Sequence, residues 1–552
     1  MKRTNKLLYK SILLTMLIII PAKASSDYKR AMETASEIRY ESTLGNISSV
    51  GYPLPLAAHW NTGWSIKEGF TPDYQLAMIE KGHYILPSFH LPGPTKTQDE
   101  SRYGYYEKAF KKAAALNLPF SFISSQWERW LTIMPEYFDL PAEKNPNVVD
   151  TDGTINKKVS PFGPVTAWQE IGQKWTSTSL LKQLQAWYPD PPRVFFVSNN
   201  EHDKLRWTEV ENSDRYMALY GAGRDDDFKR EVVGNGWIER YRALQKGMKE
   251  GLINDSWKNG ATFTGYSAFG TNAFGRWAGW INYSLYTKGR IEPWFLAWDG
   301  ASLSYYQHDW SGVSDYNVWS MQIQAMNWIF MIDEARNSFN RDFIIELSTW
   351  DGFEPDGSVK NKRAYYASLG QQVNPERYEG YVQFGMWLLR PRIVREYRGT
   401  RATLADEESY FLSIVRSVDR VHKNETLKKF WRSGRMVVND LHKHPYQINV
   451  PNEYASVERW FLLDTSLDSE RPWKYDWSEP HLSSALPVFA LALLIGDAPE
   501  REWLVYLHSP LKNYKDVKVT IPDYSPINVD VGSSGSFYHV NEKNKTITFI
   551  QD

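Results

Sequence analysis

The stretch Arg193-Val-Phe-Phe-Val-Ser-Asn-Asn-Glu-His202 decides the fold expected for this chain. Two prolines, residues 191–192, precede it, and residues 194–197 are apolar without alternation. An apolar run of this length, bounded by turn residues, is typical of a strand that is buried on both faces, as the strands of parallel sheets are. We expect the C-terminal tip of this strand to present Asn200 and Glu201.

A second stretch, Asp342-Phe-Ile-Ile-Glu-Leu-Ser-Thr-Trp-Asp351, has the same design and presents Glu346 at another strand end. Strand-like and helix-like runs alternate from about residue 50 to residue 425. The strands predicted from this pattern are residues 54–58, 84–88, 120–124, 194–198, 262–266, 294–298, 343–346 and 381–385. Helices are expected between them, among them residues 105–116, 227–250, 316–335 and 405–421. Eight such alternations predict an α/β fold with a parallel sheet closed into a (β/α)8 TIM barrel.

The connections after the third and fourth predicted strands are long, and long loops of this kind lie over the C-terminal face of a barrel. Asp150-x-Asp152-Gly153 lies in the first of them. It lacks the further ligands and the closing glutamate of a calcium loop, so we expect a plain surface turn.

The pattern changes past residue 425. The last fifty residues contain the alternating runs 503–507, 517–521 and 546–550, punctuated by glycine, proline and asparagine. Such runs are typical of strands in a small β-sandwich. We therefore divide the chain into a signal segment at residues 1–24, a catalytic barrel at 25–425 and a C-terminal extension at 426–552 that ends in an all-β, sandwich-like domain. The apolar segment 485–495 in this extension is expected to be buried.

Composition excludes several classes of function. Lys+Arg 64 against Asp+Glu 65 leaves no basic excess, which argues against a nucleic-acid binder. Cysteine is absent, so disulfides and thiolate metal sites are excluded. No histidine pair has the spacing of a metal site, and we predict neither a catalytic metal nor a cofactor. Aromatic residues make up 15% of the chain, with 24 Trp, and such rings either pack a core or form platforms for sugar rings.

The N-terminus has the pattern of an export signal. A basic segment with Lys2, Arg3, Lys6 and Lys10 precedes an apolar run from residue 11 to residue 20, which is too short to span a bilayer. Small residues follow, and we expect cleavage near Ala24. The mature chain is then expected to be secreted or periplasmic, without a membrane segment.

Cleaving a glycosidic bond requires a proton donor on one side of the anomeric carbon and a second carboxylate on the other. Glu201 and Glu346, at the ends of the fourth and seventh predicted strands, meet this requirement. At these residues the chain resembles the clan A glycoside hydrolases over roughly residues 50–425. The resemblance implies that Glu201 is the acid/base, that Glu346 is the nucleophile and that Asn200 contacts the sugar 2-hydroxyl. The chain departs from the family pattern just before this pair, where Ser198-Asn199 replaces the usual aromatic residue.

The resemblance also implies a retaining mechanism, with the two carboxyl groups about 5–5.5 Å apart. It implies a raised pKa for Glu201, so that this residue is protonated in the resting enzyme. Clan A enzymes often have a tyrosine after strand six that contacts the nucleophile, and Tyr305 and Tyr306 both fit this place. They also have a tryptophan after strand eight at the floor of the site, a place that Trp387 fits.

Further polar and aromatic residues follow the predicted strands, and we expect them to contact substrate: His59, Trp60, His90, Trp127, Arg129, Trp298, His308 and Trp350. Asp203, Asp299 and Asp351 are reserve carboxylates near strand ends. Arginines among the loop aromatics suit an anionic sugar. With an export signal, a resemblance to clan A and long βα loops rich in Trp, the chain is similar to marine algal galactan hydrolases of the agarase, porphyranase and β-carrageenan or furcellaran type. Two alternatives stay open: a hydrolase of a neutral plant-type β-glycan, and a non-catalytic glycan-binding protein on a degenerate barrel.

Overall fold

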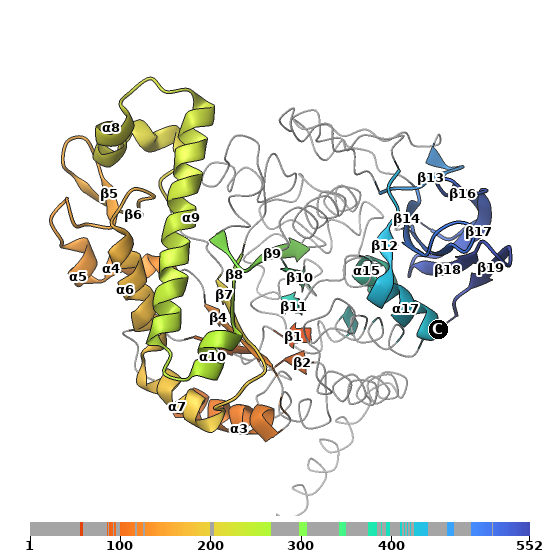
Figure 1. Ribbon diagram of the computed structural model, residues 1–552, viewed down its shortest axis with the longest axis horizontal. Helices are drawn as coiled ribbons and strands as arrows, with labels where there is room; N and C mark the ends of the chain where they lie inside the picture. Colours follow the sequence, from red (N-terminus) through yellow and green to blue (C-terminus); the bar gives the residue numbers. More distant parts are fainter. Residues whose placement is uncertain are drawn as a thin grey trace, which may run out of the picture.

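The structure is a computed structural model of the 552-residue chain. It describes residues 56–58, 85–86, 88–91, 93–94, 100–115, 117, 119–124, 127–198, 204–266, 297–305, 342–348, 374–383, 388, 393–397, 409–410, 413, 417, 420, 424–439, 461–468, 487–509 and 512–551. The fold is mixed α/β, with a parallel sheet in the centre of Figure 1 and antiparallel sheets at the C-terminal end of the chain.

The parallel sheet has nine strands in the order β2-β1-β11-β10-β9-β8-β7-β4-β3. Their bounds are β1 Leu56–Ala58, β2 Ile85–Leu86, β3 Ser88–His90, β4 Phe120–Ser124, β7 Val194–Ser198, β8 Ala261–Tyr266, β9 Gly300–Tyr305, β10 Asp342–Ser348 and β11 Ile393–Tyr397. Every neighbouring pair is parallel. The two outermost strands, β2 and β3, are separated in the sequence by Pro87 alone.

Two of the eight predicted strands are wrong. The sixth was expected at residues 294–298, but the strand in this part of the chain is β9, which begins at Gly300. The eighth was expected at residues 381–385, which overlap the helix α15 (Pro375–Gln383), and the strand β11 follows ten residues later. Proline suits the first position of a helix, and the buried residues Tyr378 and Val382 have helical i, i+4 spacing. That spacing outweighs the short β-like run at the end of α15.

Phenylalanines on adjacent strands fill one face of the sheet. The rings of Phe122 and Phe196 are 5.3 Å apart, and those of Phe196 and Phe263 are 5.1 Å apart. Phe110 from α3 (Glu100–Ala115) and Trp257 from α10 (Asp255–Gly260) stack over this face with ring centroids 6.2 Å apart. The helices therefore cover the phenylalanine face, and α3 confirms the helix expected at residues 105–116.

The long connections on either side of β7 form a helical lobe beside the sheet, seen at the left of Figure 1. The connection before β7 contains η2 (Trp127–Arg129), α4 (Trp130–Ile133), α5 (Pro135–Phe138), β5 (Asn147–Val149), β6 (Ile155–Val159), α6 (Val165–Thr176) and α7 (Ser179–Trp187). The connection after β7 contains η3 (Trp207–Asn212), α8 (Asp214–Tyr220), α9 (Asp226–Gly251) and α10. The helix expected at residues 227–250 is thus confirmed as α9.

Close contact between α6 and α9 orders this lobe. A Cβ atom on Gly247 would lie 1.8 Å from the carbonyl oxygen of Gln169, and one on Gly172 would lie 2.1 Å from that of Leu244. Small residues allow helix backbones to approach this closely. The hydroxyl of Thr176 donates across the contact to the carbonyl of Met248 at 2.7 Å.

A plain turn joins β5 to β6, as expected from the Asp150–Gly153 sequence. The amide of Gly153 donates to the carbonyl of Asp150 at 2.8 Å, and the amide of Thr154 donates to the carboxylate of Asp152 at 2.9 Å. Gly153 has φ +86°, a left-handed conformation that favours glycine. The carboxylates thus stabilise the turn itself.

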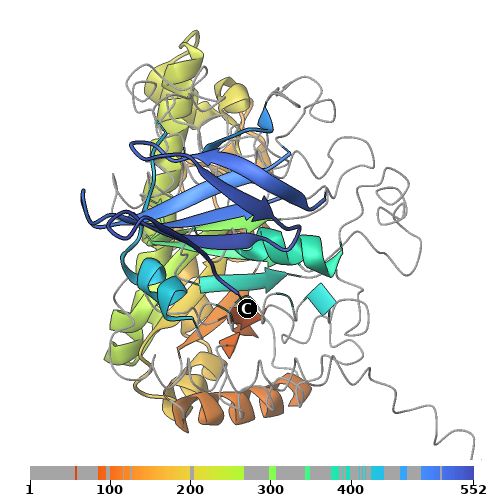
Figure 2. The ribbon, with the colours of Figure 1, turned by 90° about the vertical axis from the view of Figure 1, so that its right-hand side faces the viewer.

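The C-terminal part of the chain forms two antiparallel sheets, shown in blue in Figures 1 and 2. One has the order β12-β14-β15-β18-β19 and the other β13-β16-β17. Their bounds are β12 Arg435–Met436, β13 Asp464–Thr465, β14 Phe489–Ile495, β15 Glu502–His508, β16 Tyr514–Thr520, β17 Ile527–Val531, β18 Ser536–Asn541 and β19 Thr546–Phe549. Buried side chains from both sheets, including Trp503, Val505 and Val519, make one core. The three strands expected in the last fifty residues are confirmed as β15, β16 and β19.

The C-terminal sheets contact the helices that precede them. The hydroxyl of Tyr506 donates to the carbonyl of Gly380 in α15, and the hydroxyl of Ser533 bonds the carboxylate of Glu376. The helix α17 (Glu425–Ser433) packs on β14 with its buried residues Leu427, Phe430 and Trp431. Across the described ranges, no helix is long and apolar enough to cross a membrane.

Candidate functional site

The strands β4 and β7 end side by side at the C-terminal edge of the parallel sheet. Their last residues, Ser124 and Ser198, are register partners, and Ser198 is also the partner of Gly265 in β8. Ser124 and Ser198 are 3% and 0% exposed. Because the two strands are parallel, their C-terminal ends lie at the same edge of the sheet, where ligands of such sheets bind.

Of the two glutamates expected to be catalytic, only Glu346 is among the described residues. Glu346 is a residue of β10, where Ser304 of β9 and Arg395 of β11 are its register partners. Asn200 and Glu201 lie outside the described residues; in the sequence they follow Ser198, the last residue of β7, by two and three residues.

Several other predicted site residues also lie outside the described residues: His59, Trp60, Asp203, Tyr306, His308, Trp350, Asp351 and Trp387. The expected place of Trp387 after strand eight is wrong, because it precedes β11 in the sequence. His90 ends β3 as the register partner of Ile123. Tyr305 ends β9 as the partner of Leu347, whereas Ser304 is the partner of Glu346. Successive strand positions belong to opposite faces, so Tyr305 and Glu346 are on opposite faces of the sheet.

Trp127 and Trp298, expected to contact substrate, are core residues in this structure. They are 0% and 2% exposed, and their ring centroids are 6.1 Å apart. The indole of Trp175 donates to the carbonyl of Trp127 at 3.1 Å, and the rings of Trp298 and Tyr241 pack at a 40° tilt with their centroids 4.9 Å apart. Rings packed in this way are not available to a sugar. Their positions in the sequence beside strand ends did not distinguish core packing from substrate contact.

Arg129 remains a candidate for contact with substrate. It is exposed and lies at the end of η2, five residues past Ser124 at the end of β4. Its backbone carbonyl accepts a hydrogen bond from the hydroxyl of Thr132 at 2.7 Å, which fixes the backbone at this point.

A buried polar cluster that the sequence did not reveal lies beyond the same strand ends. Glu128 of η2 is 0% exposed, and its Oε1 lies 3.3 Å from the Nζ of Lys204. The hydroxyl of Tyr241, in α9, donates to the same oxygen at 3.0 Å. Burial raises the pKa of Tyr241 well above its usual range, and the neighbouring Glu128 raises it further. A glutamate between two tryptophans, Trp127-Glu-Arg-Trp130, was the available signal, but it did not identify the lysine.

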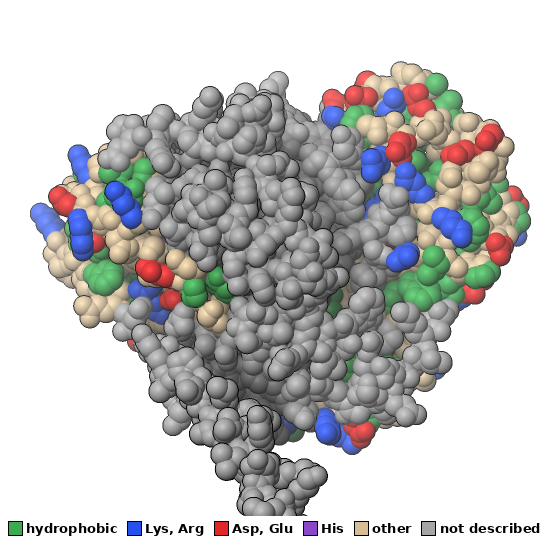
Figure 3. Space-filling view, turned by 180° about the vertical axis from the view of Figure 1, so that it is seen from behind, with side chains coloured by type: hydrophobic (Ala, Val, Ile, Leu, Met, Phe, Trp, Pro, Cys, Tyr) green, Lys and Arg blue, Asp and Glu red, His purple; other side chains and the backbone are tan. Residues whose placement is uncertain are grey.

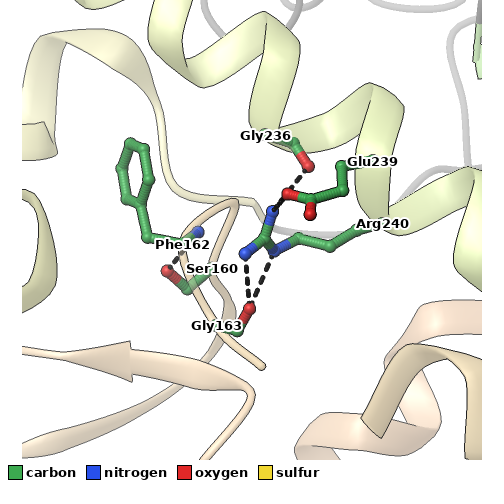
Figure 4. A network of polar contacts seen from close by, with 6 residues as sticks. All are labelled: Ser160, Phe162, Gly163, Gly236, Glu239 and Arg240. Carbon is green, nitrogen blue, oxygen red and sulfur yellow. Dashed lines mark hydrogen bonds and ion pairs between the residues drawn. The ribbon is translucent and has the colours of Figure 1, made fainter. Parts of the chain in front are cut away.

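Arg240 connects the loop after β6 to α9, as Figure 4 shows. Its guanidinium donates to the carbonyl of Gly163 through Nε at 3.0 Å and through Nη2 at 2.5 Å. Nη1 donates to the carbonyl of Gly236 at 3.0 Å and to the carboxylate of Glu239 at 2.9 Å. Burial lowers the pKa of Arg240. The arginine thereby holds the loop after β6 against α9.

A hollow of about 640 Å³ lies elsewhere, between α9, α10 and the start of β9, and it is lined by Arg242, Gln245, Lys246, Lys249, Glu250, Lys258, Trp298 and Asp299. Asp299 comes directly before β9 and lies beside Phe263 of β8, whose carbonyl accepts a hydrogen bond from its amide at 3.0 Å. Its carboxylate accepts a hydrogen bond from the amide of Phe263 at 3.0 Å, so this reserve carboxylate stabilises the sheet.

The described surface that Figure 3 shows has side chains of both charges. In Figure 3 basic and acidic side chains are intermixed over both coloured lobes. Within the described ranges, no group of three His, Cys, Asp or Glu residues is arranged to hold a metal ion.

Comparisons with known proteins give distant structural likenesses. No family model and no curated protein matches the chain. Its structure resembles α-L-fucosidase isoenzyme 2 from Paenibacillus thiaminolyticus at 12% identity and a TM-score of 0.35, over 69% of this chain and 51% of the fucosidase. It also resembles a trimodular GH5_4 subfamily endoglucanase at 9% identity and a TM-score of 0.35, over 90% of this chain and 80% of that one.

A third likeness is to a family 51 α-L-arabinofuranosidase from Bifidobacterium longum, at 9% identity and a TM-score of 0.29, over 85% of this chain and 84% of that one. All three are glycoside hydrolases, and the chain is distantly similar to them in structure. The chain spans about half the length of the fucosidase. At these scores the superpositions carry no argument about activity, which rests on the residues of the chain itself.

Proposed function

We propose that this chain is a retaining glycoside hydrolase whose parallel sheet closes into a (β/α)8 barrel. Glu201 is the acid/base and Glu346 is the nucleophile. The observation that carries the proposal is the strand register of β7 to β10, which supports a common face for positions 201 and 346 when it is continued past the strand ends.

Closure of the sheet is supported by following one register row around it. The row passes from His90 through Ile123, Val197, Thr264 and Gly300 to Asp342. The remaining steps use the spacing of the partner residues in each pair. Ile344 pairs with Ile393, so the row continues from position 342 to position 391; Val394 pairs with Leu56, so it continues to position 53. Leu56 pairs with Ile85, so the row reaches position 82. The row thus returns eight residues before its start at His90, the difference between 90 and 82. An eight-stranded barrel with a shear of 8 has this stagger.

The register also relates the two glutamates. From Glu346 the row passes to Ser304. The offsets Gly300 to Thr264 and Thr264 to Val197, continued past the strand ends, carry it to position 268 and then to position 201. Position 201 is five residues past Phe196, an odd number, so the row belongs to the face opposite the phenylalanines and the helices that cover them. In a closed barrel that face is the interior, where catalytic residues at strand ends converge.

The proposed chemistry is a double displacement. Protonated Glu201 gives its proton to the leaving glycosidic oxygen while the Glu346 carboxylate attacks the anomeric carbon. Glu201, now ionised, then takes a proton from water, which attacks the glycosyl ester and releases Glu346. Asn200 holds the sugar hydroxyl beside this centre. Of the two candidate tyrosines we favour Tyr306 as the partner of Glu346, because the register puts Tyr305 on the opposite face.

For substrate we propose an anionic algal galactan of the carrageenan or agar type. Arg129 is exposed on the segment that follows β4, and Arg206 is partly exposed on the segment that follows β7. Guanidinium groups on these two segments suit the sulfate of such a polymer. The basic and apolar segment at residues 1–24 supports export to the periplasm or the medium, where the polymer would be met.

A panel of purified polysaccharides tests this proposal. Carrageenans, furcellaran, agar, porphyran, neutral β-galactan and β-mannan are each incubated with the protein, and the oligosaccharide products are identified. We expect products from a sulfated galactan and none from the same panel with Glu346→Ala. Products only from a neutral glycan would overturn the substrate, and undiminished activity of Glu346→Ala would overturn the mechanism.

A further inference from the structure

The segment that contains Asn200 and Glu201 is held at both flanks. On one side Ser198, which is fully buried, pairs with Ser124 and Gly265. On the other side Lys204 forms a parallel bridge with Val159 of β6, and the amide of Leu205 donates to the carbonyl of Val159 at 3.2 Å. Only residues 199–203 lie between these two anchors.

A buried ion pair with Glu128 holds Lys204, the second of these flanking contacts. The Nζ of Lys204 lies 3.3 Å from Oε1 of Glu128, and the two side chains are 5% and 0% exposed. Tyr241 donates its hydroxyl to the same oxygen at 3.0 Å. One carboxylate oxygen therefore joins three elements: η2 after β4, the segment after β7, and α9. Because burial and the neighbouring Glu128 raise the pKa of Tyr241, its hydroxyl stays a donor at neutral pH.

A buried ion pair is a costly way to hold a fold together, since apolar residues of similar volume often give equal or greater stability. The advantage of a buried ion pair is its defined geometry, because a charge-assisted hydrogen bond fixes the relative position of the two groups. Here the group that is fixed lies three residues past Glu201 in the sequence.

We propose that Glu128, Lys204 and Tyr241 are positioning residues that set the place of Glu201 relative to the glycosidic oxygen. The inference rests on the proposed function, because it assigns the cluster a role in proton transfer from Glu201. A displaced acid fails most on leaving groups that require protonation. Activated leaving groups depart without a proton, so their release is insensitive to where the acid lies.

The test compares phenyl and 2,4-dinitrophenyl glycosides of the oligosaccharide that the wild-type protein releases from its polysaccharide. The variant Glu128→Gln/Lys204→Met keeps the side-chain volumes and removes both charges of this ion pair together. We expect its kcat on the phenyl glycoside to fall by about tenfold to a hundredfold, with KM little changed, as for a small misplacement of a reacting group. On the dinitrophenyl glycoside we expect glycosylation to stay within about threefold of wild type.

Tyr241→Phe removes one hydrogen bond without altering charge. We expect it too to lower kcat on the phenyl glycoside more than glycosylation by the dinitrophenyl glycoside, but by a smaller factor. The matched control is Lys158→Met, which breaks the more exposed pair of Lys158 with Glu209 between β6 and η3. We expect the control to leave the ratio of the two activities unchanged. An equal fall on both glycosides, or no fall, would assign the cluster to stability alone and overturn the inference.

Glu201→Gln separates this failure from failure of the proposed function. If Glu201→Gln discriminates between the two leaving groups and the cluster variants do not, only the positioning role is lost. If Glu201→Gln itself does not discriminate, Glu201 is not the acid and the proposed mechanism fails with it.

Discussion

The C-terminal sheets contain strand pairs that are joined by short connections, whereas every described pair of the parallel sheet joins strands that are distant along the chain. β14 and β15 pair across a connection of only residues 496–501, and β18 pairs with β19 across 542–545. In the parallel sheet β4 ends at Ser124 and its partner β7 begins at Val194. Antiparallel neighbours need only a turn, whereas parallel neighbours need a crossover. Three pairs of the C-terminal sheets therefore form across short connections, although β12–β14, β13–β16 and β15–β18 join distant strands. The parallel sheet depends throughout on side chains brought together from distant segments.

The variant expected to have the largest effect on stability is Phe196→Ala in β7. Phe196 lies between Phe122 and Phe263, so its loss leaves a cavity shared by three strands and is expected to lower the free energy of unfolding by about 3–5 kcal/mol. Urea unfolding followed by tryptophan fluorescence measures it, alongside Leu507→Ala in the C-terminal core, for which about 2–5 kcal/mol is expected.

If the two regions are independently stabilised, each variant shifts its own unfolding transition. A single transition that both variants shift equally would show that the two regions unfold as one unit and would remove the contrast.

Gly247→Ala tests the helical lobe, whose packing also joins distant segments. The added Cβ would lie 1.8 Å from the carbonyl of Gln169, so α6 and α9 must separate, at an expected cost of about 1–3 kcal/mol. Gly260→Ala is the matched control, because its Cβ would meet nothing nearer than 3.5 Å. Equal stability of the two variants by thermal unfolding would contradict the close contact of the two helices.

The smallest expected effect concerns pH and the C-terminal sheets. Lys429, by a hydrogen bond of 2.6 Å, and then His539 at 2.7 Å lower the pKa of Glu502 in β15. A lowered pKa contributes stability above the ordinary glutamate value of about 4.3, and this contribution is lost as the pH falls through the lower folded value.

Glu502→Gln removes this contribution. We therefore expect the thermal stability of the variant to depend less on pH in that acidic window than that of the wild type, with the two differing most at neutral pH. If the melting temperatures of the two proteins change with pH in parallel, the contacts of Glu502 with Lys429 and His539 contribute nothing to stability.

The sequence predicted the elements whose signals are local. The alternation in residues 503–507 and 517–521 gave β15 and β16, and the unbroken apolar run at 194–197 gave β7. It failed where a tertiary contact decides the outcome. Trp298 belongs to a buried aromatic cluster before β9, and the end of α15 has a short run that looks like a strand. The pairing of Lys204 with Glu128 joins residues far apart in the sequence and has no local signal.

The central claim is that Glu346 forms the covalent bond to the sugar, and labelling tests it most directly. The protein is incubated with a 2-deoxy-2-fluoro glycosyl fluoride of its product sugar, which traps the glycosyl-enzyme of a retaining hydrolase, and the labelled peptide is sequenced by mass spectrometry. We predict one label per chain, on Glu346. A label on another carboxylate, or turnover with inversion and no label, would contradict the account.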